Sequence, residues 1–182
     1  MPVQRRGLTE FTYSRFLTPY LSDYKGFSVF LDSDILCLAD ICELVDSVDS
    51  LAPVSVSKNK LRYEWASVMV FNNQLCEFIL KPSVVGNENN ALYDFAWTKK
   101  VGDLSPDWNH LVGYDEPNPN AKLVHFTQGI PCFPETADSE FAKEWQQDAD
   151  EMCSTVTWKE IMGNSVHAKP VYERLQQSYA VM

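Results

Sequence analysis

An apolar segment that ends in two aspartates constrains the fold of this chain more than any other feature. Residues 26–41 read GFSVFLDSDILCLADI, so the run from Phe27 to Leu31 leads directly into Asp32 and Asp34. The run FSVFL is too apolar for a half-exposed strand, and we therefore expect a short strand in the centre of a sheet. In open α/β sheets, ligands bind beyond the carboxyl ends of the strands, which is where the two aspartates stand.

Two interpretations of the aspartates stay open on spacing alone. Residues two apart in extended backbone project to the same side, so both carboxylates can face one point and hold a hard divalent cation. Acidic residues are also common in solvated turns after a strand, where they need no ligand.

Helical and strand patterns alternate along the rest of the chain, which is typical of an α/β protein. Residues 8–26 favour a helix with Thr9 as its N-cap, Gly26 at its end and a kink at Pro19. Its apolar stripe consists of Tyr13, Phe16, Leu17, Tyr20 and Leu21. Further strands are expected at 52–56, 66–72 and 122–126, and further helices at 38–47, 74–80, 89–97 and 138–152. We expect a loop at 102–120 and a helical or frayed segment at 170–182.

The composition is that of a globular, acidic chain. Hydrophobic residues make up 45% of the 182 residues, and the formal net charge of -10 would repel nucleic acid and anionic membranes. An acidic protein that handles a phosphorylated ligand needs a cation between the two, which favours the metal interpretation. No apolar run approaches the roughly 18 residues that span a bilayer, so no transmembrane segment is expected. The five scattered cysteines are expected to be reduced core thiols of a cytoplasmic protein.

Several sequence blocks, in the same order, resemble one known family. FTYSRFLTPYL and GFSVFLDSDILCLADICEL are similar to the metal-binding core of GT-A glycosyltransferases of the family 8 type, which carry an Arg-containing helix, an apolar strand, D-x-D and an acidic helix. EWASVMVFNN, VGDLSPDWNHLVGYDEPNP and AKLVHFTQGIPCFPE continue the resemblance, which extends from Thr9 to about Trp145. It implies a GT-A-like, Rossmann-related mixed sheet flanked by helices. We expect a single domain over residues 1–182 with a core at about 9–153.

The resemblance implies a metal centre and a donor. Asp32 and Asp34 would bind Mn²⁺ or Mg²⁺ that bridges the diphosphate of a nucleotide sugar such as a UDP-sugar, and His125 in VHFTQG would be the third protein ligand. An imidazole beside carboxylates shifts the preference towards Mn²⁺. Without the resemblance, a lone histidine on an apolar strand would be interpreted as a satisfied core residue.

The remaining implied roles concern the donor. Arg15 is expected on the polar side of the first helix, where it would contact the donor sugar and phosphate, unless it forms only a surface salt bridge. Gly129 would let the backbone approach the phosphates, and Asp94 would bind the sugar hydroxyls. Three further residues suit either a sugar site or the core: Trp65, Trp108 and Asn109.

The chain departs from the family at two places. GIPCFPE lacks the lysine that family members carry after their His-Gly motif, and only MPVQRRGL precedes the first helix where the family has further strands. We therefore expect an exposed sheet edge, which a second copy or another chain could cover. Three explanations stay open: another chain supplies the nucleotide-binding strands, the sequence is a truncated gene product, or it represents a reduced subfamily.

The predicted function is a metal-dependent glycosyltransferase of hexosyltransferase type, acting on a glycan or small acceptor. A non-catalytic GT-A remnant that acts in binding or interaction is the alternative. A metal-dependent phosphoesterase that uses the same aspartates is a third candidate. The sequence does not offer the additional acidic ligands that phosphoesterase metal sites usually contain.

Overall fold

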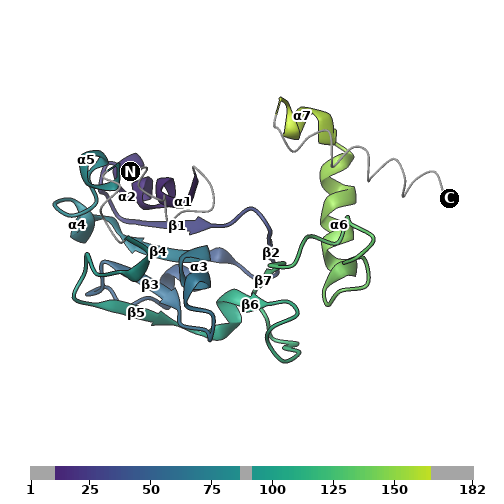
Figure 1. The fold of residues 1–182 in the computed structure, drawn as a ribbon, viewed down its shortest axis with the longest axis horizontal. Helices are drawn as coiled ribbons and strands as arrows, with labels where there is room; N and C mark the ends of the chain where they lie inside the picture. The colour runs from purple at the N-terminus through teal and green to yellow at the C-terminus, as the bar shows by residue number, and fades with distance from the viewer. Residues whose placement is uncertain (1–10, 87–91, 165–182) are drawn as a thin grey trace, which may run out of the picture. The chain divides into compact units, whose positions relative to one another are not determined.

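The computed structural model describes residues 11–86 and 92–164. Its strands form a four-stranded sheet in the order β1-β4-β3-β5 and a three-stranded sheet in the order β2-β7-β6 (Figure 1). The strands are β1 Phe27–Leu31, β2 Ile35–Cys37, β3 Val54–Ser57, β4 Val68–Asn72, β5 Val101–Leu104, β6 His110–Leu111 and β7 Leu123–His125. The α-helices are α1 Phe11–Ser14, α2 Thr18–Leu21, α3 Ile41–Asp46, α4 Asn73–Cys76, α5 Pro82–Val85, α6 Ala142–Cys153 and α7 Trp158–Met162. The 3-10 helices are η1 Arg15–Leu17, η2 Arg62–Ser67, η3 Leu92–Asp94 and η4 Pro106–Asn109.

The four-stranded sheet is mixed. β4 pairs antiparallel with both β1 and β3, whereas β3 pairs parallel with β5. β1 stands at the end of the order, so the expectation of a central strand was wrong. The strand is also half-exposed, contrary to the expectation: none of its five residues is buried, and Phe30 packs on the core cluster as a partly buried side chain. An apolar run such as FSVFL predicts a strand, but it does not report how many neighbouring strands complete its hydrogen bonds or how far its side chains are covered. Phe27 is 41% exposed, as suits an edge strand. That a second copy or partner chain covers this edge stays a prediction.

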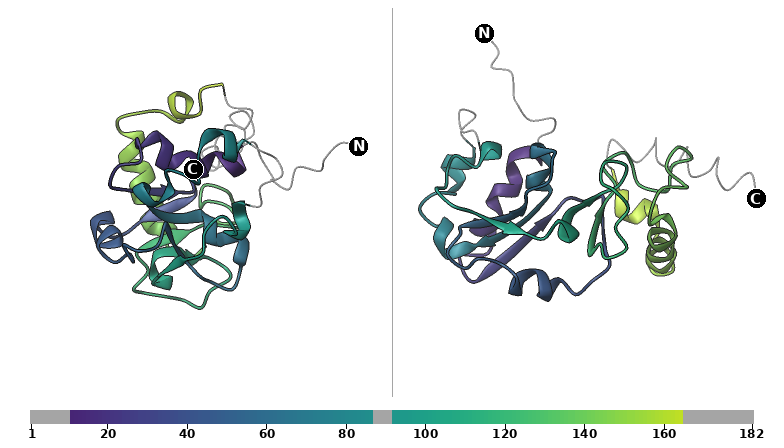
Figure 2. Two further views of the ribbon diagram at one scale, coloured as in Figure 1. Left: turned by 90° about the vertical axis from the view of Figure 1, so that its left-hand side faces the viewer. Right: turned by 90° about the horizontal axis from the view of Figure 1, so that it is seen from below.

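One face of this sheet carries the main hydrophobic core. Val54 and Val56 of β3 and Met69 and Phe71 of β4 lie in one buried cluster with Phe16. α1 and α2 lie on one side of the sheet and α3 on the other (Figure 2, right). The helix α3, which was predicted, begins at Ile41 and has Asp40 as its N-cap, whose side chain accepts a hydrogen bond from the Cys42 backbone N–H.

The predicted first helix is divided into α1, η1 and α2. Pro19 lies in the first turn of α2, where no helical N–H is needed, so it starts a helix instead of kinking one. Only part of the predicted apolar stripe is buried: Phe16 is fully buried, whereas Tyr20 is 47% and Leu21 76% exposed. The interruption at η1 changes the rotation per residue, which turns the last two stripe positions away from the core. Thr9 lies outside the described residues.

The predicted loop at 102–120 was wrong over its first half. It contains most of β5, all of η4 and all of β6, because Asp, Asn and Pro in this stretch conceal the buried positions Leu104, Trp108 and Leu111. The predicted helix at 74–80 is reduced to α4. That at 89–97 is reduced to η3, its first residues lying outside the described part. The short helix α5 was not predicted.

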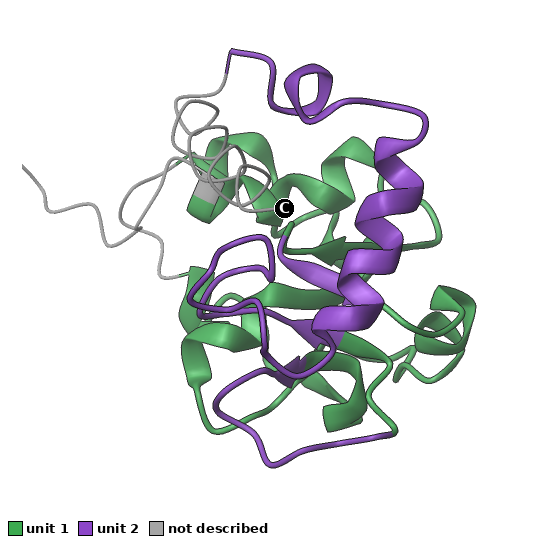
Figure 3. Ribbon diagram, turned by 90° about the vertical axis from the view of Figure 1, so that its right-hand side faces the viewer, with its two compact units in different colours: residues 1–33, 37–109, 120–123 green, residues 34–36, 110–119, 124–182 purple. Residues whose placement is uncertain are grey.

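β6 and β7 pair in parallel, with His110 opposite Val124 and Leu111 opposite His125. β7 and the long helix α6 were both predicted. The chain divides into two compact units, residues 1–33, 37–109 and 120–123, and residues 34–36, 110–119 and 124–182 (Figure 3). The predicted C-terminal segment 170–182 lies outside the described residues, and the single-domain expectation stays a prediction.

The cysteines correct one expectation from the sequence. All five are free, but only Cys76 is buried; Cys37, Cys42 and Cys153 are exposed, and Cys132 is intermediate. The apolar segments around Cys37 and Cys42 are short, so their thiols face solvent. No helix within residues 11–86 and 92–164 has the length and apolar character needed to cross a membrane.

Candidate metal centre

The segment after β1 places the two aspartates. The Asp32 backbone N–H donates to the Ser67 carbonyl at 3.0 Å and so continues the pairing of β1 with β4. The Asp34 carbonyl accepts from the Phe126 N–H, also at 3.0 Å, immediately before β2 begins. Ser33 and Asp34 form a turn, so the pair is not in the extended backbone that the sequence suggested. A turn between two anchored residues fixes both carboxylates at the carboxyl end of β1.

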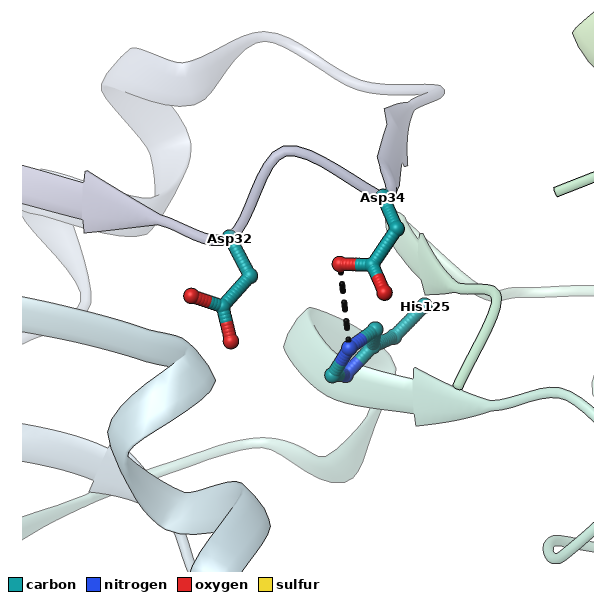
Figure 4. A group of neighbouring side chains, drawn as sticks. All are labelled: Asp32, Asp34 and His125. Carbon is teal, nitrogen blue, oxygen red and sulfur yellow. Dashed lines mark ion pairs between the residues drawn. The ribbon is translucent and has the colours of Figure 1, made fainter. Parts of the chain in front are cut away.

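His125 completes the group. It ends β7 and is 3% exposed, and its carbonyl accepts from the Val112 N–H at 3.0 Å. The His125 Nε2 lies 3.3 Å from Asp34 Oδ1 (Figure 4). Asp32, Asp34 and His125 each offer one ligand atom, and these atoms all lie within 4.8 Å of one another. The three residues selected from the sequence as metal ligands therefore lie together.

The donor set and its spacing fit a divalent cation. Protein ligands of such a cation bind at about 2.1 Å, so two of them lie about 3.0 Å apart when adjacent and about 4.2 Å apart when opposite. The 3.3 Å contact of Asp34 with His125 is close to the first value, and the 4.8 Å limit slightly exceeds the second. Small side-chain rotations would suffice to share an ion. Two carboxylates and one imidazole suit Mn²⁺.

Arg15 lies inside the protein, which corrects its predicted place on the polar side of the first helix. Its side chain is 12% exposed and forms a two-pronged ion pair with Asp32, Nη2 to Oδ1 at 3.1 Å and Nη1 to Oδ2 at 3.3 Å. Nη1 also donates to the Ala66 carbonyl at 2.7 Å. The guanidinium lies 4.8 Å from the Phe30 ring centre and 5.3 Å from that of Tyr93. Arg15 is thus fixed by charge, hydrogen bonding and ring contacts together.

Tyr93 and Glu64 belong to the surroundings of the Arg15–Asp32 pair. The sequence did not predict a place for either residue near the site. Burial raises the pKa of Tyr93 to about 12, the Arg15 charge works against this, and the charges of Asp32 and Glu64 add to it. The phenol therefore stays neutral at ordinary pH. Glu64 is only 9% exposed and accepts from the Ser67 hydroxyl at 2.7 Å. The sequence signal for Glu64 is a glutamate in η2, a few residues before the apolar strand β4.

Asp94 and Gly129 are not part of the ligand group within the described residues. Asp94 ends η3 with its side chain exposed, and its carbonyl accepts from Arg62 at 3.0 Å. Its neighbour Tyr93, not Asp94, contacts Arg15. Gly129 has a φ of +120°, a conformation that L side chains rarely adopt, and its N–H donates to the Phe126 carbonyl. Their predicted roles towards a donor stay predictions.

The three residues that suited either sugar or core belong to the packing. Trp108 is 2% and Asn109 1% exposed, and Asn109 donates to the Glu64 carbonyl at 3.0 Å. Trp65 packs on the core cluster, and its indole N–H donates to the Asn59 carbonyl. The burial of Trp108 and Asn109 and the packing of the partly buried Trp65 account for all three without a ligand.

A second histidine lies on the neighbouring strand. His110 is 2% exposed, and its Nε2 lies 2.9 Å from Glu140 Oε2. Glu140 also accepts from the Asn118 N–H at 3.3 Å. His110 thereby ties the segment before α6 to β6, and it is not a member of the ligand group.

Comparison with known proteins gives one curated relative and one structural neighbour. No protein-family model matches the chain. The chain is 33% identical over 169 residues to Protein CDI of Arabidopsis thaliana, a match that covers 79% of this chain and 65% of the length of that protein. In structure it is similar to the apo form of WbbM, a bifunctional glycosyltransferase, with a TM-score of 0.55 and 17% identity. That match covers 94% of this chain and 39% of the WbbM chain.

The architecture and this neighbour together define the class of fold. The chain has a GT-A-like, mixed α/β fold whose mixed sheets are flanked by helices. The fold class predicted from the sequence is thereby confirmed. Membership of family 8 stays a prediction.

Proposed function

We propose that this chain is a metal-dependent glycosyltransferase that moves a sugar from a nucleotide-diphosphate donor, such as a UDP-sugar, to a glycan or small acceptor. The observation that carries the proposal is the convergence of Asp32, Asp34 and His125, with one ligand atom from each within 4.8 Å of the others. The GT-A-like fold supports it, because the group lies beyond the carboxyl end of β1, where open α/β sheets bind ligands.

Three side chains would hold the cation, Mn²⁺ or Mg²⁺. Asp34 and His125 are already in contact, and Asp32 is held close by the anchored turn. When bound, the cation would neutralise charge that develops on the departing diphosphate. His125 is almost fully buried, which limits the rotation of its ring and keeps Nε2 directed at Asp34.

Other residues would bind and orient the donor. Arg15 offers a planar fork that suits a phosphate as well as it suits the Asp32 carboxylate. Gly129 would let the backbone approach the diphosphate, and the exposed carboxylate of Asp94 would accept hydrogen bonds from sugar hydroxyls. The family's phosphate-binding lysine is missing from GIPCFPE, so Arg15 would carry more of the phosphate contact.

Calorimetry with UDP, with and without Mn²⁺, tests the proposal. We expect UDP to bind measurably only with Mn²⁺ present and Asp34→Asn to abolish this binding without unfolding the protein. Asp103→Asn is the matched control, because Asp103 is a largely exposed carboxylate on β5 that pairs with Lys58. Hydrolysis or transfer of UDP-sugars should follow the same pattern. A folded wild-type chain that binds no nucleotide with Mn²⁺ would support the non-catalytic remnant instead.

A further inference from the structure

Arg15 already occupies one of the carboxylates that the cation needs. Both of its terminal nitrogens contact Asp32, at 3.1 and 3.3 Å. The pair is largely removed from water, with the Arg15 side chain 12% and the Asp32 side chain 23% exposed. Screening by solvent and salt is therefore weak at this position. A cation that binds Asp32 must share the carboxylate with a fixed positive charge.

The arrangement of Arg15 is well anchored but incomplete. Nη1 has a second acceptor in the Ala66 carbonyl, which keeps the guanidinium next to Asp32. The buried Nε has no hydrogen-bond partner among the described residues. An unpaired buried donor is costly, so the position that Arg15 adopts without ligand does not use its full bonding capacity.

A diphosphate would change this balance. It brings negative charge to both the cation and the guanidinium and offers oxygen acceptors in the geometry that an Arg fork prefers. Once Arg15 has a phosphate partner, Asp32 is released for the cation. The charge on the diphosphate also removes the repulsion between the guanidinium and the ion.

We propose that Arg15 is a positioning residue that couples the two ligands: it holds Asp32 in the free protein, weakens binding of the cation alone and yields Asp32 when a diphosphate binds. This inference rests on the proposed function and adds an energetic link between cation and donor. The coupling is reciprocal, so Mn²⁺ must raise the affinity for UDP by the same factor by which UDP raises the affinity for Mn²⁺.

Titration calorimetry with Mn²⁺ alone, with UDP and with inorganic diphosphate tests the coupling. Arg15→Met removes the charge but keeps an apolar side chain next to the rings of Phe30 and Tyr93. We expect it to bind Mn²⁺ alone about tenfold more tightly than the wild type, since it lacks the competing charge. UDP and inorganic diphosphate should raise the Mn²⁺ affinity about tenfold or more in the wild type and less than about threefold in Arg15→Met.

Two further variants keep the test decisive. Arg15→Lys retains the charge but lacks the fork. Its affinity for Mn²⁺ alone should therefore lie between those of the wild type and Arg15→Met. If Arg15→Met does not fold, Arg15→Lys replaces it as the test variant. Lys58→Met is the control for loss of a surface cation, because Lys58 pairs with Asp103 instead of the ligand group, and it should match the wild type.

Two outcomes would overturn the coupling, and a third concerns the proposed function. Equal or weaker binding of Mn²⁺ to folded Arg15→Met and Arg15→Lys would mean that Arg15 does not compete for Asp32. Unchanged enhancement by UDP in both variants would contradict a link through Arg15. If neither Mn²⁺ nor UDP binds to the wild type or to any variant, the proposed function itself fails, and the coupling fails with it.

Discussion

Replacing Phe16 by alanine tests the packing that holds Arg15 in place. Phe16 is fully buried, and its ring forms edge contacts with Tyr93, Phe95 and Trp97 at centroid distances of 5.8, 6.2 and 6.3 Å. Burial of the side chain contributes about 2–3 kcal/mol to the free energy of unfolding, and each ring pair adds roughly 0.5–1.5 kcal/mol. Partial collapse of the cavity lowers this sum, so we expect a loss of about 4 kcal/mol for Phe16→Ala.

Urea denaturation followed by circular dichroism measures the loss directly. Thermal unfolding should shift down by about 8–16 °C, since 1 kcal/mol corresponds to roughly 2–4 °C in a chain of this size. Leu21→Ala is the matched control, because Leu21 belonged to the same predicted stripe but is 76% exposed, and its effect should stay within about 0.5 kcal/mol. Equal losses for the two variants, or a loss below about 1 kcal/mol for Phe16→Ala, would refute the described core.

Three more predictions concern single groups. Burial raises the pKa of Cys76 to about 12, so its thiol should not react with a disulfide reagent in the native protein at about pH 8. Cys76→Ala should then leave the native thiol count unchanged and remove one thiol in urea, and a lower native count would contradict this burial. For Tyr93, whose folded pKa of about 12 exceeds its ordinary value of 10.0, the stabilising contribution is fully present below pH 10 and is lost as pH rises towards 12. Ultraviolet titration should show the highest phenol step disappear in Tyr93→Phe; if that step stays, the assignment to Tyr93 is wrong. Gly129→Ala should lower the free energy of unfolding by about 1–3 kcal/mol because of its φ of +120°. The added Cβ would meet only ordinary contacts at 3.6 Å, so an unchanged urea midpoint would show that the backbone adapts there without cost.

The sequence predicted those strands and helices whose pattern of apolar and polar residues is not interrupted by turn-forming residues. β1, β3, β4 and β7 follow from short apolar runs, and α6 follows from a long polar helix pattern. β5 and β6 were missed because residues far away in the sequence bury Leu104 and Leu111. The sequence neighbours of these two leucines are mostly polar, so the local pattern does not indicate a strand. β1 was assigned to the centre of the sheet because of its apolar content, which reports neither the number of hydrogen-bonded neighbours nor how far the side chains are covered; none of its residues is buried.

The candidate metal centre, like the fold, was predictable only in part. The ligand residues Asp32, Asp34 and His125 could be selected from motif resemblance, although the two aspartates converge through a turn and not through extended backbone. The pairing of Arg15 with Asp32 could not be predicted, because helix periodicity assigned Arg15 to the polar side. The 3-10 turn directs it inward, where Ala66, Phe30 and Tyr93 hold it. Such contacts depend on tertiary packing that a local pattern does not contain.

The central claim is that three side chains share one ion, and anomalous diffraction at the manganese edge tests it most directly. Crystals grown with Mn²⁺ and UDP should show one strong anomalous peak at about 2.0–2.3 Å from a carboxylate oxygen of residue 32, one of residue 34 and the Nε2 of residue 125. A peak elsewhere, or nucleotide density with no manganese beside this histidine, would contradict the account.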